Sequence, residues 1–373
     1  MVTKILECNV DDISKGGVYS LVNNVIQHNL DNKRTIDIAS IAEFEDKNDI
    51  DELNKKNCSV FFVGSKRSKI LRFYNIYKKT RALIINEKYD YVHIHSDTSY
   101  IVLPFLLAAK NSKVKKVIIH SHAAGLDGSH RKIKLFLHKL FKNYISKSTA
   151  ELVACSDVAG KWMFSSSVQD KVKIINNGID LRKFKYNPEI RSKVRTKLNL
   201  ENKLVVGNVG RLAFQKNHIF LIKVFKKLVE TNPNAILFLV GEGPLKNELK
   251  GLVKNNNLAN NVIFYGTSSH VENLLQAMDV FALPSHFEGL PIAGVEAQAA
   301  GLPTIFSKEI SASAGLISNS IFLPINDSKK DINNWVETII SYSKRPHVET
   351  EEELKREGYS IDQTVSSFFD LYQ

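Results

Sequence analysis

The chain has 373 residues, 43% of them apolar, and a formal net charge of +12 at pH 7. This length exceeds that of one ordinary core, so two domains of about 150–200 residues are expected. No run of about 18 apolar residues occurs, which argues against a membrane-spanning helix. The opening residues lack the basic and apolar regions of a signal peptide. Cys8, Cys58 and Cys155 lack metal-ligand spacing, so we expect a reduced cytoplasmic protein without zinc or disulfides.

The first half alternates apolar strands with helical stretches. The strand Thr3–Val10 precedes Gly16-Gly17 and an amphipathic run, and further strands are predicted at 35–42, 59–64, 91–94, 117–120 and 172–175. This alternation indicates a doubly wound, mainly parallel sheet, in which ligands gather at the carboxyl ends of the strands. The glycine pair lets a ligand approach bare backbone N–H groups, although many such turns need glycine only for steric reasons.

Four histidines stand at the ends of two of these predicted strands. His93 and His95 end one strand, and His120 and His122 end the next. Alternation puts His120 and His122 on the same side of their strand. Histidines there can contact a substrate, ligate a metal or only satisfy backbone groups. No carboxylate or cysteine stands at a spacing that supports a metal site.

The second half restarts the alternating pattern and carries two basic residues in a loop. Arg211 and Lys216 lie between the predicted strand Leu204–Val209 and a helix that begins at His218. In doubly wound folds this is where cations meet phosphate, for which arginine and lysine are both suited. The alternative is that both are solvated surface charges.

Two glutamates flank a later helix start. The strand Val280–Leu283 is followed by a loop with Glu288, and a helix opens at Leu290-Pro291 and ends at Gly301. Glu296 lies more than one turn into this helix, so the two carboxylates do not form a pair on one helix face. They are either solvated acids or, since their neighbours are small and apolar, carboxylates with polar partners.

Three segments in this order carry a family resemblance: GRLAFQKN (210–217), VGEGP (240–244) and EGLPIAGVEAQAAGLP (288–303). They resemble the retaining glycosyltransferases of family 4, the group 1 glycosyl transferases of polysaccharide biosynthesis, whose signature joins E-x7-E to A-x-A-x-G-x-P. The resemblance implies the α/β GT-B fold, two Rossmann-like doubly wound parallel-sheet domains that face each other across a cleft.

The implied domains are an acceptor-side domain at 1–180, a nucleotide-sugar-binding domain at 181–345 and a helical tail at 346–373 that crosses back to the first domain. NNGID, residues 176–180, resembles the segment that ends the first domain in this family, and the polar stretch 180–188 fits a linker.

The implied reaction moves a sugar from a nucleotide-diphosphate donor, expected to be a UDP-sugar, to an acceptor hydroxyl with retention of the anomeric configuration. We expect it in capsular, exopolysaccharide or other cell-surface glycan synthesis, with no metal or other cofactor. Arg211 and Lys216 would stabilise the leaving diphosphate. Glu296 would bind the ribose hydroxyls and Glu288 the sugar hydroxyls. Departure on the front face is expected rather than a covalent intermediate on Glu288.

The resemblance implies further contacts to the donor. Backbone donors are expected from Gly16 and Gly17 and from Gly289 and Leu290. His122 matches the family histidine beside the donor sugar, with His120 as second choice.

Basic residues are concentrated in one part of the first half. The segment Lys66–Lys147 holds 18 Lys and Arg against 4 Asp and Glu, an excess of 14 that exceeds the whole chain's +12. Within it, Arg131–Lys147 has apolar residues at 133, 136, 137, 140, 141, 144 and 145. This face, with Lys66–Arg81, either docks on the anionic inner surface of the cell membrane near a lipid-linked acceptor or is only a solvated basic face.

Two other functions fit parts of the pattern. A GT-B nucleotide-sugar epimerase or a phosphorylase would share the fold, and a donor-only assay separates an epimerase from a transferase. A nucleic-acid-binding protein would explain the basic half, but no interleaved stacking aromatics or known module are present, so no specific nucleic acid is expected.

Overall fold

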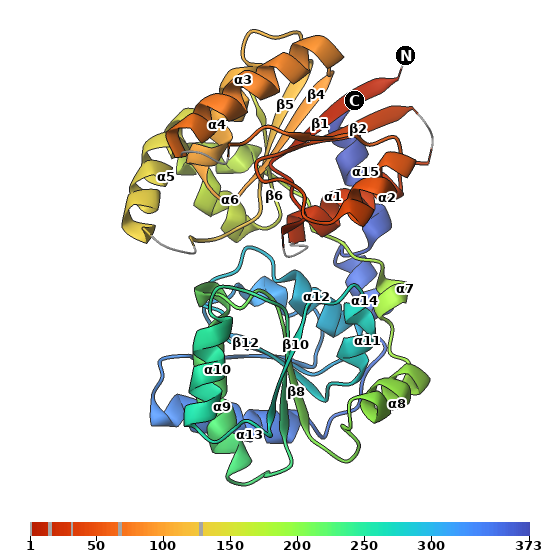
Figure 1. The fold of residues 1–373 in the computed structure, drawn as a ribbon, viewed down its shortest axis with the longest axis vertical. Helices are drawn as coiled ribbons and strands as arrows, with labels where there is room; N and C mark the ends of the chain where they lie inside the picture. The colour runs from red at the N-terminus through yellow and green to blue at the C-terminus, as the bar shows by residue number, and fades with distance from the viewer. Residues whose placement is uncertain (1, 14–16, 31–32, 66–68, 127–129) are drawn as a thin grey trace. The chain divides into compact units, whose positions relative to one another are not determined.

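The computed structural model describes residues 2–13, 17–30, 33–65, 69–126 and 130–373. It divides into two units, one formed by Met1–Gly178 and Ile361–Gln373 and the other by Ile179–Ser360. Each unit has a parallel sheet covered by helices (Figure 1). The predicted α/β class with two doubly wound sheets is therefore confirmed.

The sheet of the first unit has the strand order β3-β2-β1-β4-β5-β6-β7, and every neighbouring pair is parallel. Its strands are β1 (Thr3–Cys8), β2 (Arg34–Ser40), β3 (Val60–Phe62), β4 (Tyr91–Ser96), β5 (Lys116–Ser121), β6 (Glu151–Ala154) and β7 (Lys173–Ile174). The winding direction reverses between β1 and β4. The carboxyl ends of these two strands therefore form the switch point at which ligands bind in doubly wound folds.

Helices cover both faces of this sheet. They are α1 (Gly17–Gln27), α2 (Lys47–Lys55), α3 (Lys69–Glu87), α4 (Ser99–Ala109), α5 (Arg131–Ser146), α6 (Asp157–Met163) and α15 (Ile361–Leu371). On one face, Ile5 shares a core with α1 and α15, whereas its neighbour Leu6 shares a separate core with α3, α4, α5 and α6. The alternation of side chains along β1 thus sorts the helices into two layers.

The sheet of the second unit has the order β10-β9-β8-β11-β12-β13, again with parallel pairs. Its strands are β8 (Val205–Val209), β9 (Ile236–Val240), β10 (Val262–Gly266), β11 (Val280–Leu283), β12 (Thr304–Ser307) and β13 (Ser320–Leu323). Here the winding reverses between β8 and β11, so the loops after these two strands lie at the switch point.

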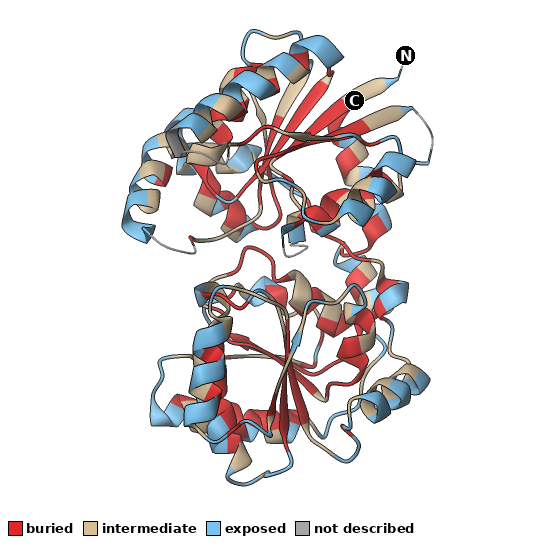
Figure 2. Ribbon diagram, viewed as in Figure 1, coloured by how far each residue is buried: buried red, intermediate tan, exposed pale blue. Residues whose placement is uncertain are grey.

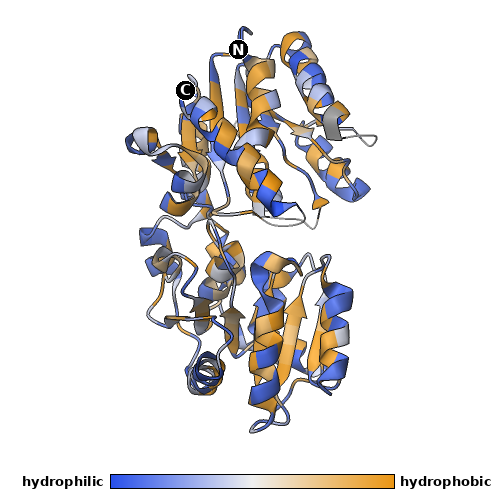
Figure 3. Cartoon of the chain, turned by 90° about the vertical axis from the view of Figure 1, so that its left-hand side faces the viewer, coloured by the Kyte–Doolittle hydropathy of each residue, from blue (hydrophilic) through white to orange (hydrophobic). Residues whose placement is uncertain are grey.

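The helices of this unit are α7 (Leu181–Phe184), α8 (Pro188–Lys197), α9 (His218–Val229), α10 (Lys246–Asn255), α11 (Val271–Gln276), α12 (Ile292–Ala299), α13 (Lys329–Tyr342) and α14 (Glu351–Arg356). Strand β9 is buried along its whole length, as expected for a strand covered on both faces. Figure 2 shows the buried strands between helices whose outer sides are exposed, and Figure 3 shows the same strands as apolar.

Three details differ from the sequence predictions. The stretch 180–188, expected as a linker, contains α7, because Leu181 and Phe184 are buried three residues apart. Strand β13 was not predicted, since only one of its four residues is fully buried and its apolar run is short. Of the expected tail 346–373, residues up to Ser360 belong to the second unit, and α15 packs on α1 in the first.

Candidate functional site

Two loops meet at the switch point of the second unit. One follows β8 and contains the short 3-10 helix Phe214–Lys216, and the other runs from Pro284 to Pro291 after β11. Because β8 and β11 are paired, both loops leave the sheet at the same edge. The predicted residues Lys216 and Glu288 lie on these loops.

The structure brings Lys216 and Glu288 into direct contact. Lys216 Nζ donates to Glu288 Oε1 over 2.7 Å, and Gln215 Nε2 donates to Glu288 Oε2 over 3.0 Å. The Glu288 carboxylate is only 6% exposed and the Lys216 side chain 14%. A buried carboxylate needs such partners, so Glu288 is not the solvated acid that was the alternative.

Further bonds tie the two loops together. The backbone N–H of His286 donates to the carbonyl of Gln215 over 2.8 Å, and Gln215 Nε2 donates to the carbonyl of Phe287 over 3.1 Å. The rings of Phe214 and His286 stack at 4.5 Å between centroids. Gln215 therefore holds the carboxylate and the loop that carries it, a role that sequence reasoning missed although Gln215 immediately precedes Lys216.

The VGEGP segment supports the loop after β8 through backbone contacts. Leu212 N–H donates to the carbonyl of Glu242 over 2.9 Å. A Cβ on Gly243 would lie 2.4 Å from the carbonyl oxygen of Leu212, so a side chain there would displace one of the two loops. Glycine is required at this position because the two backbones approach so closely.

A buried polar cluster fixes the start of α9. The two side chains of Asn208 and His218 are joined by a 2.9 Å hydrogen bond, and Asn208 Nδ2 donates to the carbonyl of Ala282 over 2.7 Å. Burial, with a smaller effect of Lys216, lowers the pKa of His218 to about 3, so its ring is neutral. The strands β8 and β11 are thereby fastened to the helix that follows Lys216.

Glu296 lies on α12, half-buried and five residues into the helix. Burial raises the pKa of Glu296 from 4.5 to about 7, against the attraction of Lys183 and with added repulsion from Glu272. A carboxylate in this state gains from hydroxyl donors, because each hydrogen bond stabilises its charged form.

The other predicted site residues of this unit differ in exposure. The Arg211 side chain is exposed at the beginning of the loop after β8, whereas Gly289 and Leu290 are buried before α12. The N-cap of α12 is Pro291, whose side chain makes no capping hydrogen bond. The helix dipole there is consequently free to act on a ligand.

One of the two predicted glycines of the first unit lies at the start of α1. Gly17 is its first residue and is exposed, while Gly16 lies outside the described residues.

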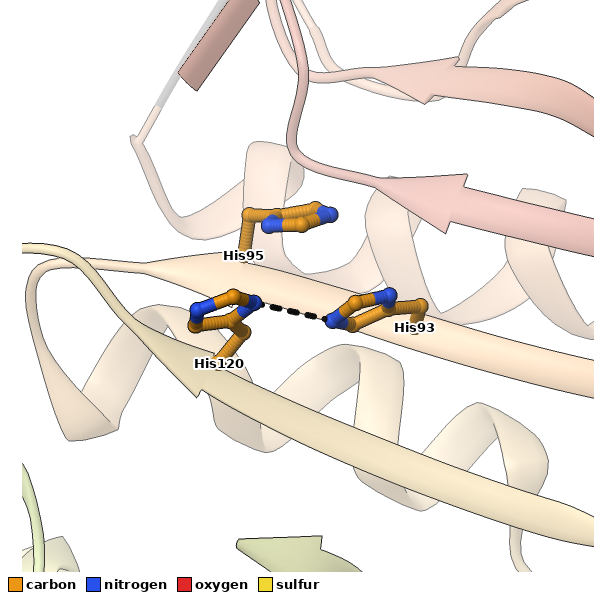
Figure 4. Close-up of side chains that lie close together, drawn as sticks. All are labelled: His93, His95 and His120. Atoms are coloured by element: carbon orange, nitrogen blue, oxygen red, sulfur yellow. Dashed lines mark hydrogen bonds between the residues drawn. The ribbon is translucent and has the colours of Figure 1, made fainter. Parts of the chain in front are cut away.

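Histidines gather at the switch point of the first unit. The parallel register pairs Glu7 with His93 and His95 with His120, and these side chains all face α15 (Figure 4 shows His93, His95 and His120). His95 Nε2 lies 2.6 Å from Glu7 Oε2, and His95 Nδ1 lies 2.8 Å from Nε2 of the predicted site residue His122. His122 is therefore the outer member of a hydrogen-bonded chain that begins at a buried carboxylate.

A second branch leaves the same carboxylate. Tyr372 Oη donates to Glu7 Oε1 over 2.6 Å and lies 2.7 Å from His93 Nδ1, and His93 Nε2 lies 3.2 Å from His120 Nδ1. Burial would raise the pKa of Glu7, but His93 and His95 hold it below its ordinary value. Glu7 is thus a buried carboxylate kept charged by its partners.

His93, His95 and His120 are close enough for one metal ion to reach a nitrogen of each. Both ring nitrogens of His93 and of His95 already take part in hydrogen bonds, as does Nδ1 of His120. His120 Nε2 is buried and has no hydrogen-bond partner within the described residues. The other named nitrogens of these three rings are linked in a hydrogen-bonded network.

Sequence reasoning missed Glu7 and Tyr372. The signal for Glu7 was a single carboxylate inside the apolar strand ILECNV, since a charge in a fully buried strand needs a partner. No local signal marks Tyr372, which reaches Glu7 only because α15 packs on the first unit.

Comparison with known proteins identifies the family. The model of the glycosyl transferases group 1 matches residues 190–360, and the model of glycosyltransferase family 4 matches residues 40–183. A putative glycosyltransferase of Bacillus subtilis, EpsF, is 33% identical over 300 residues, which is 77% of this chain and 75% of EpsF. The chain belongs to glycosyltransferase family 4. The predictions of the family and of glycosyltransferase activity are confirmed.

Other similar proteins agree with this assignment. An Escherichia coli enzyme described as a UDP-Gal:alpha-D-GlcNAc-diphosphoundecaprenol alpha-1,3-galactosyltransferase is 30% identical to this glycosyltransferase over 309 residues, 78% of this chain and 76% of that enzyme. Among solved structures, Anabaena HepE in complex with UDP has a TM-score of 0.73 at 18% identity, with 99% of each chain covered. These comparisons give no support to an epimerase, a phosphorylase or a nucleic-acid-binding protein.

Proposed function

We propose that this glycosyltransferase moves a sugar from a UDP-sugar to a hydroxyl of a lipid-linked glycan acceptor, with retention of configuration and without a metal ion, in the synthesis of a cell-surface polysaccharide. The observation that carries the proposal is the Lys216–Glu288 pair at the switch point between β8 and β11. A buried cation and carboxylate at this place suit a diphosphate and sugar hydroxyls respectively.

The site residues then have separate roles in bond breaking. As the glycosidic bond breaks, negative charge grows on the leaving diphosphate, and Lys216 and the exposed Arg211 stabilise it. Lys216 also holds Glu288 in place before the donor binds. Glu288 accepts hydrogen bonds from the sugar hydroxyls, while Gly289, Leu290 and the start of α12 provide backbone donors.

Glu296 is the proposed ribose ligand. Its carboxylate is half-buried on α12, with a pKa raised to about 7. Two vicinal hydroxyl groups can donate to the two oxygens of one carboxylate, which lowers its pKa and favours binding. We place Gly16, Gly17 and His122 among the substrate contacts of the first unit.

The descriptions of similar proteins support the choice of a uridine base and of a lipid-linked acceptor. HepE was solved with UDP and with UDP-glucose, and the Escherichia coli relative is described as using UDP-Gal and a diphosphoundecaprenol acceptor. A Corynebacterium relative is instead described as GDP-mannose-dependent, so GDP-sugars are the matched comparison in a test of the base.

The surface of the first unit supports a contact with the membrane that carries such an acceptor. Along α5, Ile133, Phe136 and Leu140 are 61%, 66% and 55% exposed, and they form one stripe at helical spacing. The residues Lys132 and Lys139 of the same helix are also exposed. An exposed apolar stripe among basic residues fits an anionic lipid surface.

Helix α3, part of the expected face, also has exposed apolar and basic residues. Leu71, Tyr74 and Lys78 are exposed. Lys79 is exposed too, but its Nζ donates to the carbonyls of Phe62 and Gly64, at 3.2 and 3.4 Å. Arg81 instead donates to the carbonyls of Ala108 and Lys110, at 3.2 and 3.0 Å, and so ties α3 to α4. Residues 66–68 of the expected face lie outside the described residues. No described helix is long and apolar enough to cross a membrane.

A thermal-shift screen over UDP-sugars, GDP-sugars and the free nucleotides tests the donor. A bound donor raises Tm by an amount that grows with the logarithm of its concentration relative to its Kd. We expect stabilisation by UDP and by one UDP-sugar, unchanged by a chelator, and no release of free sugar from donor alone. Stabilisation by GDP-sugars alone would overturn the choice of base, and no stabilisation by any nucleotide would overturn the proposed function.

A further inference from the structure

The chain Glu7–His95–His122 fixes where the protons lie on two imidazole rings. Glu7 is charged and can only accept, so the nitrogen of His95 that faces it, Nε2, must donate over 2.6 Å. Burial and the neighbouring His93 lower the pKa of His95 to about 4, against the opposite effect of Glu7. At neutral pH His95 therefore has one proton, on Nε2, and its Nδ1 is an acceptor.

The same reasoning extends to the next ring. His95 Nδ1 lies 2.8 Å from His122 Nε2, so Nε2 of His122 must be the donor. Burial, and then the neighbouring His95 and His93, lower the pKa of His122 well below its ordinary value, so this ring also has a single proton. The remaining nitrogen, His122 Nδ1, is consequently a bare lone pair.

His122 Nδ1 is buried and has no hydrogen-bond partner within the described parts of the chain. An unsatisfied buried acceptor is costly, and such atoms are rare unless a ligand completes them. His122 follows the last residue of β5 at the carboxyl edge of the sheet, where its own N–H donates to the carbonyl of Ser96 over 3.3 Å. Substrate hydroxyl groups are the donors that a glycosyltransferase brings to this edge.

We propose that Glu7 and His95 are positioning residues that hold His122 in the tautomer with a bare Nδ1, so that His122 accepts a hydrogen bond from a substrate hydroxyl and donates none to it. This inference rests on the proposed function, which places His122 in contact with the sugar or the acceptor. It adds the direction of the hydrogen bond in that contact, in which the substrate hydroxyl donates and His122 accepts. A substrate analogue that replaces the hydroxyl with a group that only accepts should therefore be rejected.

The other branch of the network leads to a different histidine, His120, whose Nε2 is also buried without a hydrogen-bond partner among the described residues. Tyr372 Oη donates to Glu7, so His93 Nδ1 donates to Tyr372. This branch leads to His120 and not to His122. Loss of the Tyr372 hydroxyl therefore leaves the bonds Glu7–His95 and His95–His122 in place.

The tautomer is measured by nuclear magnetic resonance on protein labelled with nitrogen-15 in its histidine rings, because protonated and bare ring nitrogens resonate far apart. The His122 signals are assigned by their absence in His122→Asn. In the wild type we expect a protonated Nε2 and a bare Nδ1 on His122. A protonated Nδ1, or a change in the network signals on addition of a chelator, would overturn the inference, the second in favour of a bound metal.

Two substitutions of Glu7 test whether its role depends on a hydrogen-bond acceptor oxygen or only on the space that the side chain fills. Glu7→Leu removes the acceptor, which releases His95 and allows His122 to take the other tautomer. Glu7→Gln retains an oxygen that accepts from His95, so the wild-type His122 pattern should persist. His138→Gln is the matched control, since His138 is a buried, hydrogen-bonded histidine of the same unit outside this network. An unchanged His122 pattern in Glu7→Leu would overturn the inference.

Activity then distinguishes this inference from the proposed function. Glu7→Leu should lower kcat by about tenfold or more, as loss of a buried orienting partner typically does, and Glu7→Gln should recover most of it. UDP affinity should be unchanged in both, because the side chains proposed to bind the nucleotide, those of Arg211, Lys216 and Glu296, lie in the other unit. Normal kcat in Glu7→Leu contradicts the inference alone. Absence of UDP binding by the wild type contradicts the proposed function. In that case the His122 tautomer of the wild type, measured by nuclear magnetic resonance, still tests the hydrogen-bonded network.

Discussion

The ammonium of Lys216 and the carboxylate of Glu288 are joined by a 2.7 Å hydrogen bond in a place where both side chains are nearly shielded from solvent. Seventy-two positions separate them in the sequence, and they meet because β8 and β11 pair at the switch point of the second sheet. Each group stabilises the other. In the proposed function, a donor then supplies a diphosphate for the cation and hydroxyls for the carboxylate.

The pair predicts coupled effects of mutation on activity. Lys216→Ala and Glu288→Gln should each lower kcat by about 10²–10³-fold, the usual cost of losing one charge-stabilising group. The fold-loss of kcat in the double variant should be much smaller than the product of the two single fold-losses, because the effects of contacting residues are not independent. Steady-state transfer from the donor found by the screen measures this. Fully multiplicative losses would mean that the two residues act separately.

The same substitutions should differ in stability. Lys216→Ala leaves the buried Glu288 carboxylate with the neutral Gln215 amide as a partner, whereas Glu288→Gln removes the charge that needs compensation. Lys216→Ala is therefore expected to lower Tm more than Glu288→Gln, while circular dichroism shows both to be folded. The reverse order of Tm would show that the ion pair does not control the stability of these loops.

Glu296 predicts that donor binding depends on pH near neutrality. Its folded pKa of about 7 lies above the ordinary 4.5, so the free protein binds a proton there that the unfolded chain lacks, and this stabilisation is lost as pH rises through 7. Hydroxyl donors favour the charged form. The affinity for a UDP-sugar, whose diphosphate has no ionisation near neutral pH, should therefore rise with pH up to about 7 and then level off. Calorimetry in two buffers should detect proton release below pH 7.

The control for this prediction is Glu296→Gln, which cannot release the proton. It should bind the UDP-sugar more weakly, with an affinity that is flat between pH 6 and pH 8. If the variant retained the pH dependence of the wild type, another group would be responsible.

The close approach of the Gly243 backbone to the loop after β8 predicts that a side chain at position 243 disturbs the site indirectly. Gly243→Ala places a Cβ 2.4 Å from the carbonyl oxygen of Leu212, so one loop must move, at a cost of about 1–3 kcal/mol. UDP affinity should fall with it. Gly251→Ala is the matched control, because a Cβ there meets nothing within 4 Å and alanine favours the helix α10 by about 0.5–1 kcal/mol. Equal effects of the two substitutions on Tm would refute the close-approach argument.

The exposed stripe on α5 predicts lipid binding. Phe136→Ser with Leu140→Ser should reduce flotation with liposomes that contain anionic lipid, since both apolar side chains are more than half exposed. Leu30→Ser, which changes an exposed leucine elsewhere in the same unit, should leave flotation unchanged. Equal binding of the wild type to neutral and anionic liposomes would contradict an electrostatic contribution.

Much of the second unit could be predicted because its signals are local. The loop residues Lys216 and Glu288 follow apolar strands in the sequence, and a doubly wound order brings the ends of such strands together. Gln215 was not predicted, because only the fold shows that its amide reaches Glu288. The β13 strand and α7 were missed since each has few buried residues.

The network in the first unit could be predicted only in part. The histidine pairs at 93 and 95 and at 120 and 122 were visible as strand ends, but their partners Glu7 and Tyr372 lie at opposite ends of the chain. Their bonds depend on strand register and on the return of α15, which are long-range properties. Composition predicted the basic face, but the outward direction of Phe136 and Leu140 came only from packing.

Titration calorimetry with UDP, in the presence of a chelator, tests the central claim most directly. The wild type should bind UDP, Lys216→Ala should bind it about tenfold or more weakly, as expected for a lost charged hydrogen bond, and Lys223→Ala, which removes an exposed lysine paired with Asp327, should bind like the wild type. Equal UDP affinity in Lys216→Ala, or no UDP binding by the wild type, would contradict a nucleotide-diphosphate site at this switch point.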